Sequence, residues 1–191
     1  MDEATLRRGK PVAHSIWGNA IAVLVGDFLL ARSLSIAAET KRPDVIKVVA
    51  EITENMSQGE IHQLLKKGFL DLTEKEYMEI IRRKTAVLFQ GTCRVGALIS
   101  GVSKEKEAAL AGYGFNLGIA FQMVDDLLDY SPDTPALGKK VGADLKEGKL
   151  TLPVIYSLKS ADEKDRIQME KIIKNKDFSM EDFETLIAIM K

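Results

Sequence analysis

Three aspartates stand among apolar neighbours in the stretch FQMVDDLLDY, at positions 125, 126 and 129. Asp125 and Asp129 are four residues apart, so on an α-helix they share one face, and Gln122 lies one turn earlier. An ionised carboxylate is costly to bury without a positive partner, and neighbouring carboxylates repel one another. Mg²⁺ relieves both effects, because it takes carboxylate oxygens together with substrate phosphate oxygens. By spacing alone, Asp125, Asp126 and Asp129 are equally typical of a solvated helix end.

Cations that could bind phosphate occur in three other parts of the chain. Lys84 and Thr85 fall within the apolar stripe of a predicted helix, where a lysine that faces inward needs an anionic partner. Arg7 and Arg8 stand together, and guanidinium groups suit phosphate oxygens through bidentate hydrogen bonds. The third set follows the aspartates and contains Lys139, Lys140 and Lys149. Each cation alone is typical of a surface, but together with the aspartates they indicate a site for Mg²⁺ and a phosphate compound.

Helical periodicity dominates the chain, and no stretch shows a convincing strand alternation. We predict long helices over residues 17–39, 43–67, 73–100 and 103–130. Thr73 with Glu76 has the spacing of a capping box at the start of the third of these helices. Ser160 with Glu163, and Ser179 with Asp182, have the spacing of capping boxes that begin two shorter helices. Residues 131–150, with two prolines and three glycines, form the long irregular segment, and such segments are usually functional. The pattern predicts one all-α domain over residues 1–191.

Composition excludes several other classes of protein. The chain has 191 residues, of which 46% are apolar and 29% charged, as in soluble globular proteins. Lys and Arg total 27 against 28 acidic residues, so no bulk charge indicates nucleic acid as a partner. The one cysteine excludes an internal disulfide and a CxxC metal site. Asp27 interrupts the most apolar segment and no secretory signal is present, so we expect a cytoplasmic protein without a transmembrane segment.

Four motifs together resemble the trans-polyprenyl diphosphate synthases, and most closely the long-chain type that makes octaprenyl or heptaprenyl diphosphate. They read DEATLRRGKP, GNAIAVLVGDFLLA, RRKTAVLF and FQMVDDLLDY…GKKVGADLKEGKLTLP. They stand in family order over residues 2–153. The last motif is the most specific, because DDxxD followed by GK and DLxEGKxTLP is hard to produce by chance.

The resemblance implies a homodimeric enzyme with the helical bundle of the isoprenoid synthases. Such enzymes condense an allylic diphosphate with isopentenyl diphosphate, with Mg²⁺ as cofactor, in the synthesis of isoprenoids and quinone side chains. Cleavage of the allylic C–O bond leaves a carbocation and a diphosphate anion, and Mg²⁺ and cationic side chains stabilise that anion. The double bond of isopentenyl diphosphate then attacks the carbocation and a proton is lost.

The resemblance also assigns roles by position. The substrate-binding residues it implies are Arg7, Arg8, Lys84, Thr85, Gln122, Lys139 and Lys149. The metal ligands it implies are Asp2, Asp125, Asp126 and Asp129. Lys84 and Asp125 are the two expected to act in catalysis. Lys140 is an alternative to Lys139, because the two motif spacings disagree by one residue.

The chain departs from the family pattern at both ends. The family carries a first aspartate-rich motif, and Asp2 stands where its last aspartate belongs, five residues before Arg7. The chain thus resembles the central part of a longer enzyme, truncated at both ends, and we expect it to be nearly inactive alone. A catalytically silent partner subunit, or a remnant of such a synthase, is the alternative, although intact second-motif aspartates and Lys84 argue against it. A terpene cyclase is a third reading, against which the RRG and GKxxGxDLxEGK stretches argue.

Overall fold

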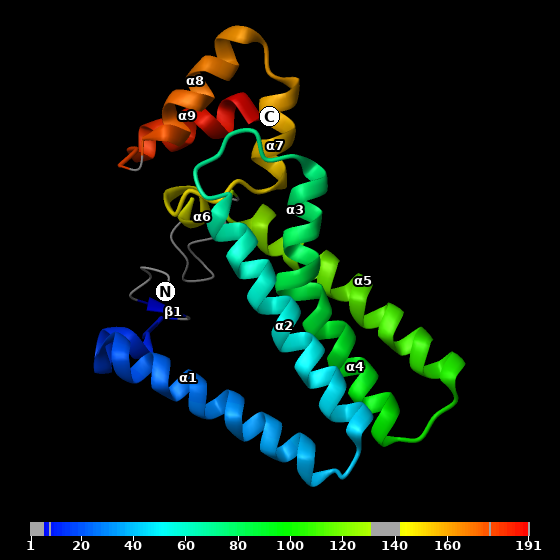
Figure 1. Cartoon of the computed structure of the whole chain (residues 1–191). Helices are drawn as coiled ribbons and strands as arrows, with labels where there is room; N and C mark the ends of the chain where they lie inside the picture. The colour runs from blue at the N-terminus through cyan, green and yellow to red at the C-terminus, as the bar shows by residue number, and fades with distance from the viewer. Residues whose placement is uncertain (1–5, 8, 131–141, 176, 191) are drawn as a thin grey trace.

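The computed structural model describes residues 6–7, 9–130, 142–175 and 177–190. These residues are almost entirely helical, which confirms the all-α prediction (Figure 1). The exception is a short antiparallel pair that the sequence did not predict. It joins β1 (Leu6–Arg7) to β2 (Lys10–Pro11), with Arg7 opposite Lys10.

The helices follow the predicted segments closely. In chain order they are α1 (Ala13–Glu39), α2 (Pro43–Leu65), α3 (Glu74–Ile81), η1 (Arg82–Ala86), α4 (Val87–Ile99), α5 (Lys104–Leu128), α6 (Ala143–Lys146), α7 (Leu152–Ser160), α8 (Glu163–Lys174) and α9 (Met180–Met190). Thr73 and Glu76 form the predicted capping box of α3. Ser103 caps α5 by accepting a hydrogen bond from the backbone of Lys106. Local capping chemistry therefore sets these helix starts.

Two expectations about the C-terminal helices are corrected. Ser160 does not begin a helix: it is the last residue of α7, and its hydroxyl donates to the carbonyl of Tyr156. The side chain of Asp162 caps α8 instead, accepting from the backbone of Asp165. α7 itself was not predicted, because nine residues give too short an apolar period. The cap of α9 by Ser179 and Asp182 is confirmed.

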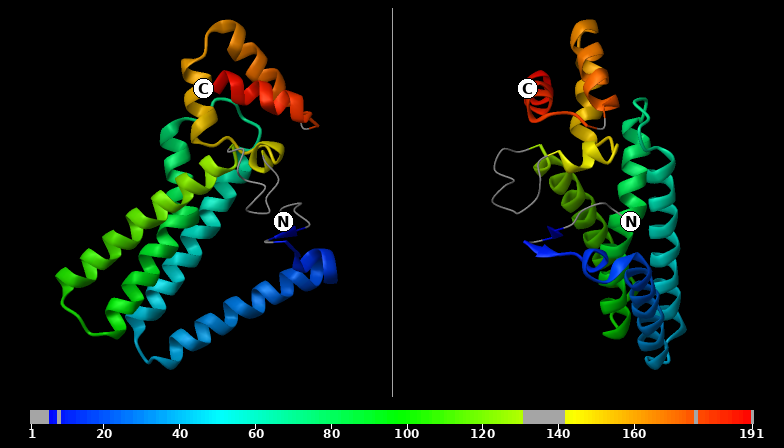
Figure 2. Two further views of the ribbon diagram at one scale, coloured as in Figure 1. Left: turned by 180° about the vertical axis from the view of Figure 1, so that it is seen from behind. Right: turned by 90° about the vertical axis from the view of Figure 1, so that its left-hand side faces the viewer.

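α2, the continuous run α3–η1–α4, and α5 lie side by side and form the body of the molecule (Figures 1 and 2). α7, α8 and α9 gather at one end of this body and share a core with α3. The fully buried centre of that core includes Val154, Met169 and Leu186. The end of α5 and the start of α7 meet at this core, which places the aspartates beside the larger of the two hydrophobic clusters among the described residues.

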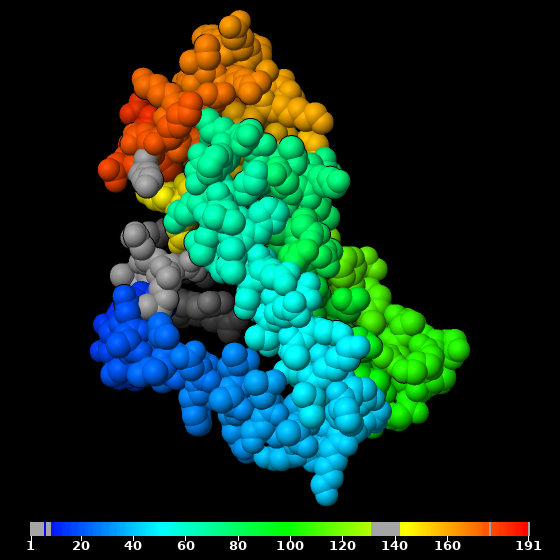
Figure 3. All heavy atoms as spheres, viewed as in Figure 1, coloured from blue at the N-terminus to red at the C-terminus, as the bar shows by residue number. Residues whose placement is uncertain are grey.

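α1 projects from the body as an arm that begins at its junction with α2 (Figures 1 and 3). It bends at Gly18, whose φ of 80° and ψ of 164° are not helical. Most of its apolar side chains are exposed, Phe28 by 66%. Among the described residues, α1 alone is long and apolar enough to cross a membrane by length and composition, a test that core helices of soluble proteins also pass.

The five residues of η1 form a π-helical turn that joins α3 to α4. A π turn adds one residue to a helical turn and is frequent at functional sites. Leu88 and Ile99, which the helical period places on one apolar stripe with Tyr77, are 40% and 58% exposed, so this part of the expected buried stripe is not buried. η1 contains Lys84 and Thr85, so the extra residue changes the direction of the two predicted substrate-binding side chains.

α5 lies very close to η1 and α4 because glycines face them. A Cβ atom at Gly118 would lie 2.6 Å from the Cα atom of Ala86, and one at Gly114 would lie 2.5 Å from the carbonyl oxygen of Phe89. Both distances are shorter than any van der Waals contact. The glycines thus set the separation of the helices that bear the two halves of the predicted site.

Candidate functional site

The three aspartates do not point into open solvent. Asp126 and Asp129 are 5% and 4% exposed, and Asp125 is half-buried. The carboxylate of Asp126 accepts two hydrogen bonds, each of 2.7 Å. The hydroxyl of Tyr77 donates to Oδ2, and Nε2 of Gln122 donates to Oδ1. Asp126 is therefore anchored both to its own helix and to α3.

The Lys-Thr pair of η1 connects to this network. The hydroxyl of Thr85 donates to Oε1 of Gln122 over 2.8 Å. A continuous set of hydrogen bonds thus runs from Thr85 through Gln122 and Asp126 to Tyr77. The structure brings together three residues that the sequence predicted as site residues and adds Tyr77, which it did not predict.

Burial determines the electrostatics of this network. Burial raises the pKa of Asp126 to about 6, against the opposing hydrogen bonds from Tyr77 and Gln122. Burial, and then the negative charge of Asp126, raise the pKa of the Tyr77 phenol. A buried carboxylate with a raised pKa is a recognised mark of a functional site, and a cation placed near Asp126 would stabilise its charged form.

Lys84 meets an anion, as predicted for an inward lysine, but the partner is within the protein. Its ammonium group lies 2.9 Å from Oε2 of Glu60 and donates to Oε1 of Gln63 over 2.6 Å. Gly59 permits this close approach, because a Cβ atom there would lie 2.7 Å from the backbone nitrogen of Lys84. The sequence analysis missed Glu60 and Gln63, although their spacing of three residues places both on one face of α2.

Asp129 links the end of α5 to the chain that returns at residue 142. Its Oδ1 and Oδ2 accept hydrogen bonds from the backbone nitrogens of Ala143 (3.2 Å) and Asp144 (3.1 Å), and its carbonyl accepts one from Gly142 (3.0 Å). Gly142 has φ of +73°, a conformation that suits glycine. This contact fixes the start of α6 directly against the aspartate motif.

Lys149 is held in place by contacts to Asp144, whose backbone is bonded to Asp129. Its backbone nitrogen donates to the carbonyl of Asp144, and its ammonium group lies 3.6 Å from Oδ1 of Asp144 and 2.5 Å from Oε2 of Glu147. The lysine side chain is 15% exposed. The predicted loop lysine is thus held at the same end of the bundle as the aspartates.

The remaining predicted residues fall outside the described part of the chain. They are Asp2, Arg8, Lys139 and its alternative Lys140. Arg7 is described through its backbone in β1 only. Their assignments therefore stay predictions.

The donor chemistry of the aspartate motif fits Mg²⁺. Among the described residues, no group of three or more His, Cys, Asp or Glu side chains is close enough to hold a metal by itself. Mg²⁺ does not require such a group, because it is usually bound by one or two carboxylates together with phosphates and water. Asp125, half-buried beside the two anchored aspartates, supplies the type of oxygen ligand that this arrangement needs.

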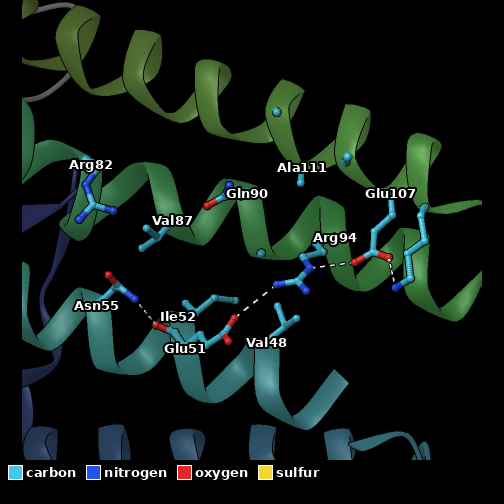
Figure 4. A pocket seen from close by; sticks show the side chains of 14 residues that line it. Val48, Glu51, Ile52, Asn55, Arg82, Val87, Gln90, Arg94, Glu107 and Ala111 are labelled. Atoms are coloured by element: carbon cyan, nitrogen blue, oxygen red, sulfur yellow. Dashed lines mark hydrogen bonds and ion pairs between the residues drawn. The ribbon is translucent and has the colours of Figure 1, made fainter. Parts of the chain in front are cut away.

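Two hollows lie along α5. A groove of about 330 Å³ adjoins Asp125, and its other lining residues are Leu117, Ala120, Phe121, Val124 and Leu128. A second hollow, of about 870 Å³, lies between α2, α4 and α5, where Arg94 is bonded to both Glu51 and Glu107 (Figure 4). Glu107 is separated from Asp125 by about 27 Å of helix at 1.5 Å per residue. The apolar groove is therefore the hollow that belongs to the aspartate motif.

Comparison with known proteins gives one consistent answer. A profile of the polyprenyl synthetase family matches residues 1–190. Octaprenyl diphosphate synthase of Haemophilus influenzae is 42% identical over 159 residues, which are 83% of this chain and 48% of that protein. Heptaprenyl diphosphate synthase component 2 of Bacillus subtilis is 36% identical over 191 residues, which are 100% of this chain and 54% of that protein. The chain spans about half the length of the curated relatives it matches.

Solved structures agree. The polyprenyl synthase from Caulobacter crescentus, complexed with calcium and isoprenyl diphosphate, superposes with a TM-score of 0.91 at 40% identity, over 97% of this chain and 57% of that one. A decaprenyl diphosphate synthase from Rhodobacter capsulatus gives 0.90 at 41% identity, over 98% and 58%. The chain belongs to the polyprenyl synthetase family.

Proposed function

We propose that this chain forms part of a prenyltransferase that condenses an allylic diphosphate with isopentenyl diphosphate to give a longer trans-polyprenyl diphosphate. The observation that carries the proposal is the set of hydrogen bonds joining Thr85 of η1 to Asp126 of α5, beside an apolar groove. Diphosphate-binding groups and a place for a hydrocarbon chain thus lie together. The bound calcium and isoprenyl diphosphate of the Caulobacter structure support it.

The residues divide the chemistry between them. Asp125, with Asp126 and Asp129, would hold Mg²⁺, which supplies Lewis-acid stabilisation of the departing diphosphate. The oxygens of the allylic diphosphate would be bound by the larger set of Arg7, Lys84, Thr85, Lys139 and Lys149. Gln122 would fix the Thr85 hydroxyl. Arg8 would bind isopentenyl diphosphate. Asp2 would join the metal ligands from the N-terminal side.

In the reaction, the allylic C–O bond breaks and its electron pair passes to the diphosphate, where the fixed cations of Lys84 and Lys149 stabilise the new charge. The double bond of isopentenyl diphosphate supplies the electron pair of the new C–C bond, which leaves a carbocation on its other carbon. A neighbouring carbon then loses a proton to the released diphosphate or to water, and the electron pair of that C–H bond forms the new double bond. The apolar wall formed by Phe121 and Val124 would keep water from the carbocation and receive the hydrocarbon chain.

Other parts of the proposal rest on the family. We propose a homodimer in the cytoplasm, working in isoprenoid or quinone side-chain synthesis. The alternative is a catalytically silent subunit or a remnant of a synthase, and a subunit has a precedent in the relative named component 2. The intact network at Asp126 favours the enzyme, since a silent subunit has no use for an anchored carboxylate.

A condensation assay tests the proposal. The purified chain is given farnesyl diphosphate, labelled isopentenyl diphosphate and Mg²⁺. It should bind diphosphate but form product at less than about 1% of the rate of the Haemophilus relative, because its sequence contains one DDxxD motif. Turnover comparable to that relative would contradict the predicted inactivity. Failure of Mg²⁺-dependent diphosphate binding would contradict the function itself.

Replacing Glu60 with Gln should strengthen binding of inorganic diphosphate. In the structure Glu60 is paired with Lys84, so a diphosphate must compete with it for the ammonium group. Both side chains are partly exposed, so we expect the affinity to rise only about two- to fivefold. Isothermal titration calorimetry with Mg²⁺ present measures it.

Glu54→Gln is the matched control for that experiment. Glu54 lies on the same helix, is exposed, and contacts Gln58 rather than a lysine of the site. It removes the same charge, so a general electrostatic effect would appear in both variants. Equal affinities of Glu60→Gln and wild type would show that the pair with Lys84 does not compete with diphosphate.

A further inference from the structure

Tyr77 is a buried phenol at the boundary between the core and the aspartate motif. It is 2% exposed, and its hydroxyl donates to Oδ2 of Asp126 over 2.7 Å. Bonds to an ionised carboxylate are stronger than neutral ones. Packing alone does not require the hydroxyl, since a phenylalanine of the same shape would fill the space. The hydroxyl therefore has a role that is specific to Asp126.

Tyr77 acts together with Thr85. The two residues stand on either side of the start of η1, eight positions apart, and they bond to Asp126 and Gln122, four positions apart on α5. Successive residues of an α-helix differ by about 100° around its axis. Rotating or sliding α5 by one residue would break both bonds, so the pair fixes one arrangement of α5 against α3 and η1.

We propose that Tyr77 is a positioning residue for the metal and diphosphate site, acting through Asp126. By holding Asp126 inward, it sets the direction of the neighbouring Asp125, which lines the apolar groove at the surface of α5. Buried polar contacts of this kind select one arrangement among several that apolar packing would permit. The inference rests on the proposed function, since it concerns the same site.

Tyr77→Phe removes the hydroxyl and keeps the ring, and Tyr130→Phe is the matched control. Tyr130 is also buried, at 7% exposure, and its hydroxyl is bonded to Thr151 over 2.8 Å rather than to a carboxylate. Urea unfolding should show similar losses of stability in both. Binding of Mn²⁺ with inorganic diphosphate, followed by the electron paramagnetic resonance of free Mn²⁺, should weaken about tenfold in Tyr77→Phe and less than about twofold in Tyr130→Phe.

A double-mutant comparison separates positioning from a general loss of structure. If Tyr77 acts through Asp126, Tyr77→Phe should have no further effect on Mn²⁺ affinity in an Asp126→Asn background. Equal Mn²⁺ affinities of wild type and Tyr77→Phe, or effects that add fully, would overturn the inference while leaving the proposed function standing. Absence of Mn²⁺–diphosphate binding in the wild type would overturn both.

A measurement on the wild-type fold covers the case in which Tyr77→Phe does not fold. The chain has four tyrosines, so in protein labelled with 3-fluorotyrosine the Tyr77 signal is assigned by elimination from Phe variants of Tyr113, Tyr130 and Tyr156. Adding Mg²⁺ and inorganic diphosphate should shift the ¹⁹F signal of Tyr77 and leave that of Tyr130 in place. A Tyr77 signal that does not move would also overturn the inference.

Discussion

Gly118→Ala should destabilise the chain by about 2–3 kcal/mol, although alanine is the better helix former. The new Cβ atom would lie 2.6 Å from the Cα of Ala86, and a backbone atom cannot turn aside as a flexible side chain can. α5 must then move away from η1, and Gln122, one turn further along, would be drawn away from Thr85. Urea denaturation followed by circular dichroism measures the change, provided that the slope against denaturant is unchanged.

Gly112→Ala is the control for that prediction. Gly112 lies in the same helix, and a Cβ atom there would meet no other atom within 4 Å. The substitution should therefore stabilise the chain by about 0.5–1 kcal/mol through helix propensity alone. If Gly118→Ala proved as stable as Gly112→Ala, the close approach of α5 to η1 would not be a property of the protein in solution.

Asp125→Asn should weaken Mg²⁺-dependent binding of diphosphate by about 100-fold or more. Loss of a residue that only orients a metal ligand typically costs 10- to 100-fold, and the proposed function makes Asp125 a ligand itself. The amide keeps the shape of the side chain but provides no negative charge for the metal. Calorimetry with inorganic diphosphate, with Mg²⁺ and then with EDTA, isolates the metal-dependent part.

Asp177→Asn supplies the comparison, because Asp177 is exposed and lies between α8 and α9 rather than on α5. It should leave diphosphate affinity unchanged. An Asp125→Asn protein that retained the wild-type affinity would show that Asp126 or Asp129 carries the metal instead, or that diphosphate binds through the lysines alone.

The fold could be predicted from the sequence to the extent that local signals determine it. The capping boxes at Thr73 and Ser179 gave helix starts that the structure confirms. The π turn could not be predicted, because RRKTA contains no proline or glycine and its extra residue arises from packing against α2 and α5.

In the candidate site, too, contacts within one helix could be predicted from the sequence, and contacts between helices could not. Gln122 and Asp126 share a face by helical spacing, so their contact could be foreseen. The bond from Tyr77 to Asp126 joins residues 49 positions apart, and the pair of Lys84 with Glu60 joins two different helices. A single sequence carries no record of such pairings, because they depend on how far one helix slides along another.

Asp129, directly after α5, accepts hydrogen bonds from the backbone of the three residues that lead into α6, which are Gly142, Ala143 and Asp144. Through these bonds the position of α6 depends directly on that of α5, because one residue accepts all three hydrogen bonds. A displacement of either helix would therefore be transmitted to the other, and with it to Lys149, whose backbone is bonded to Asp144.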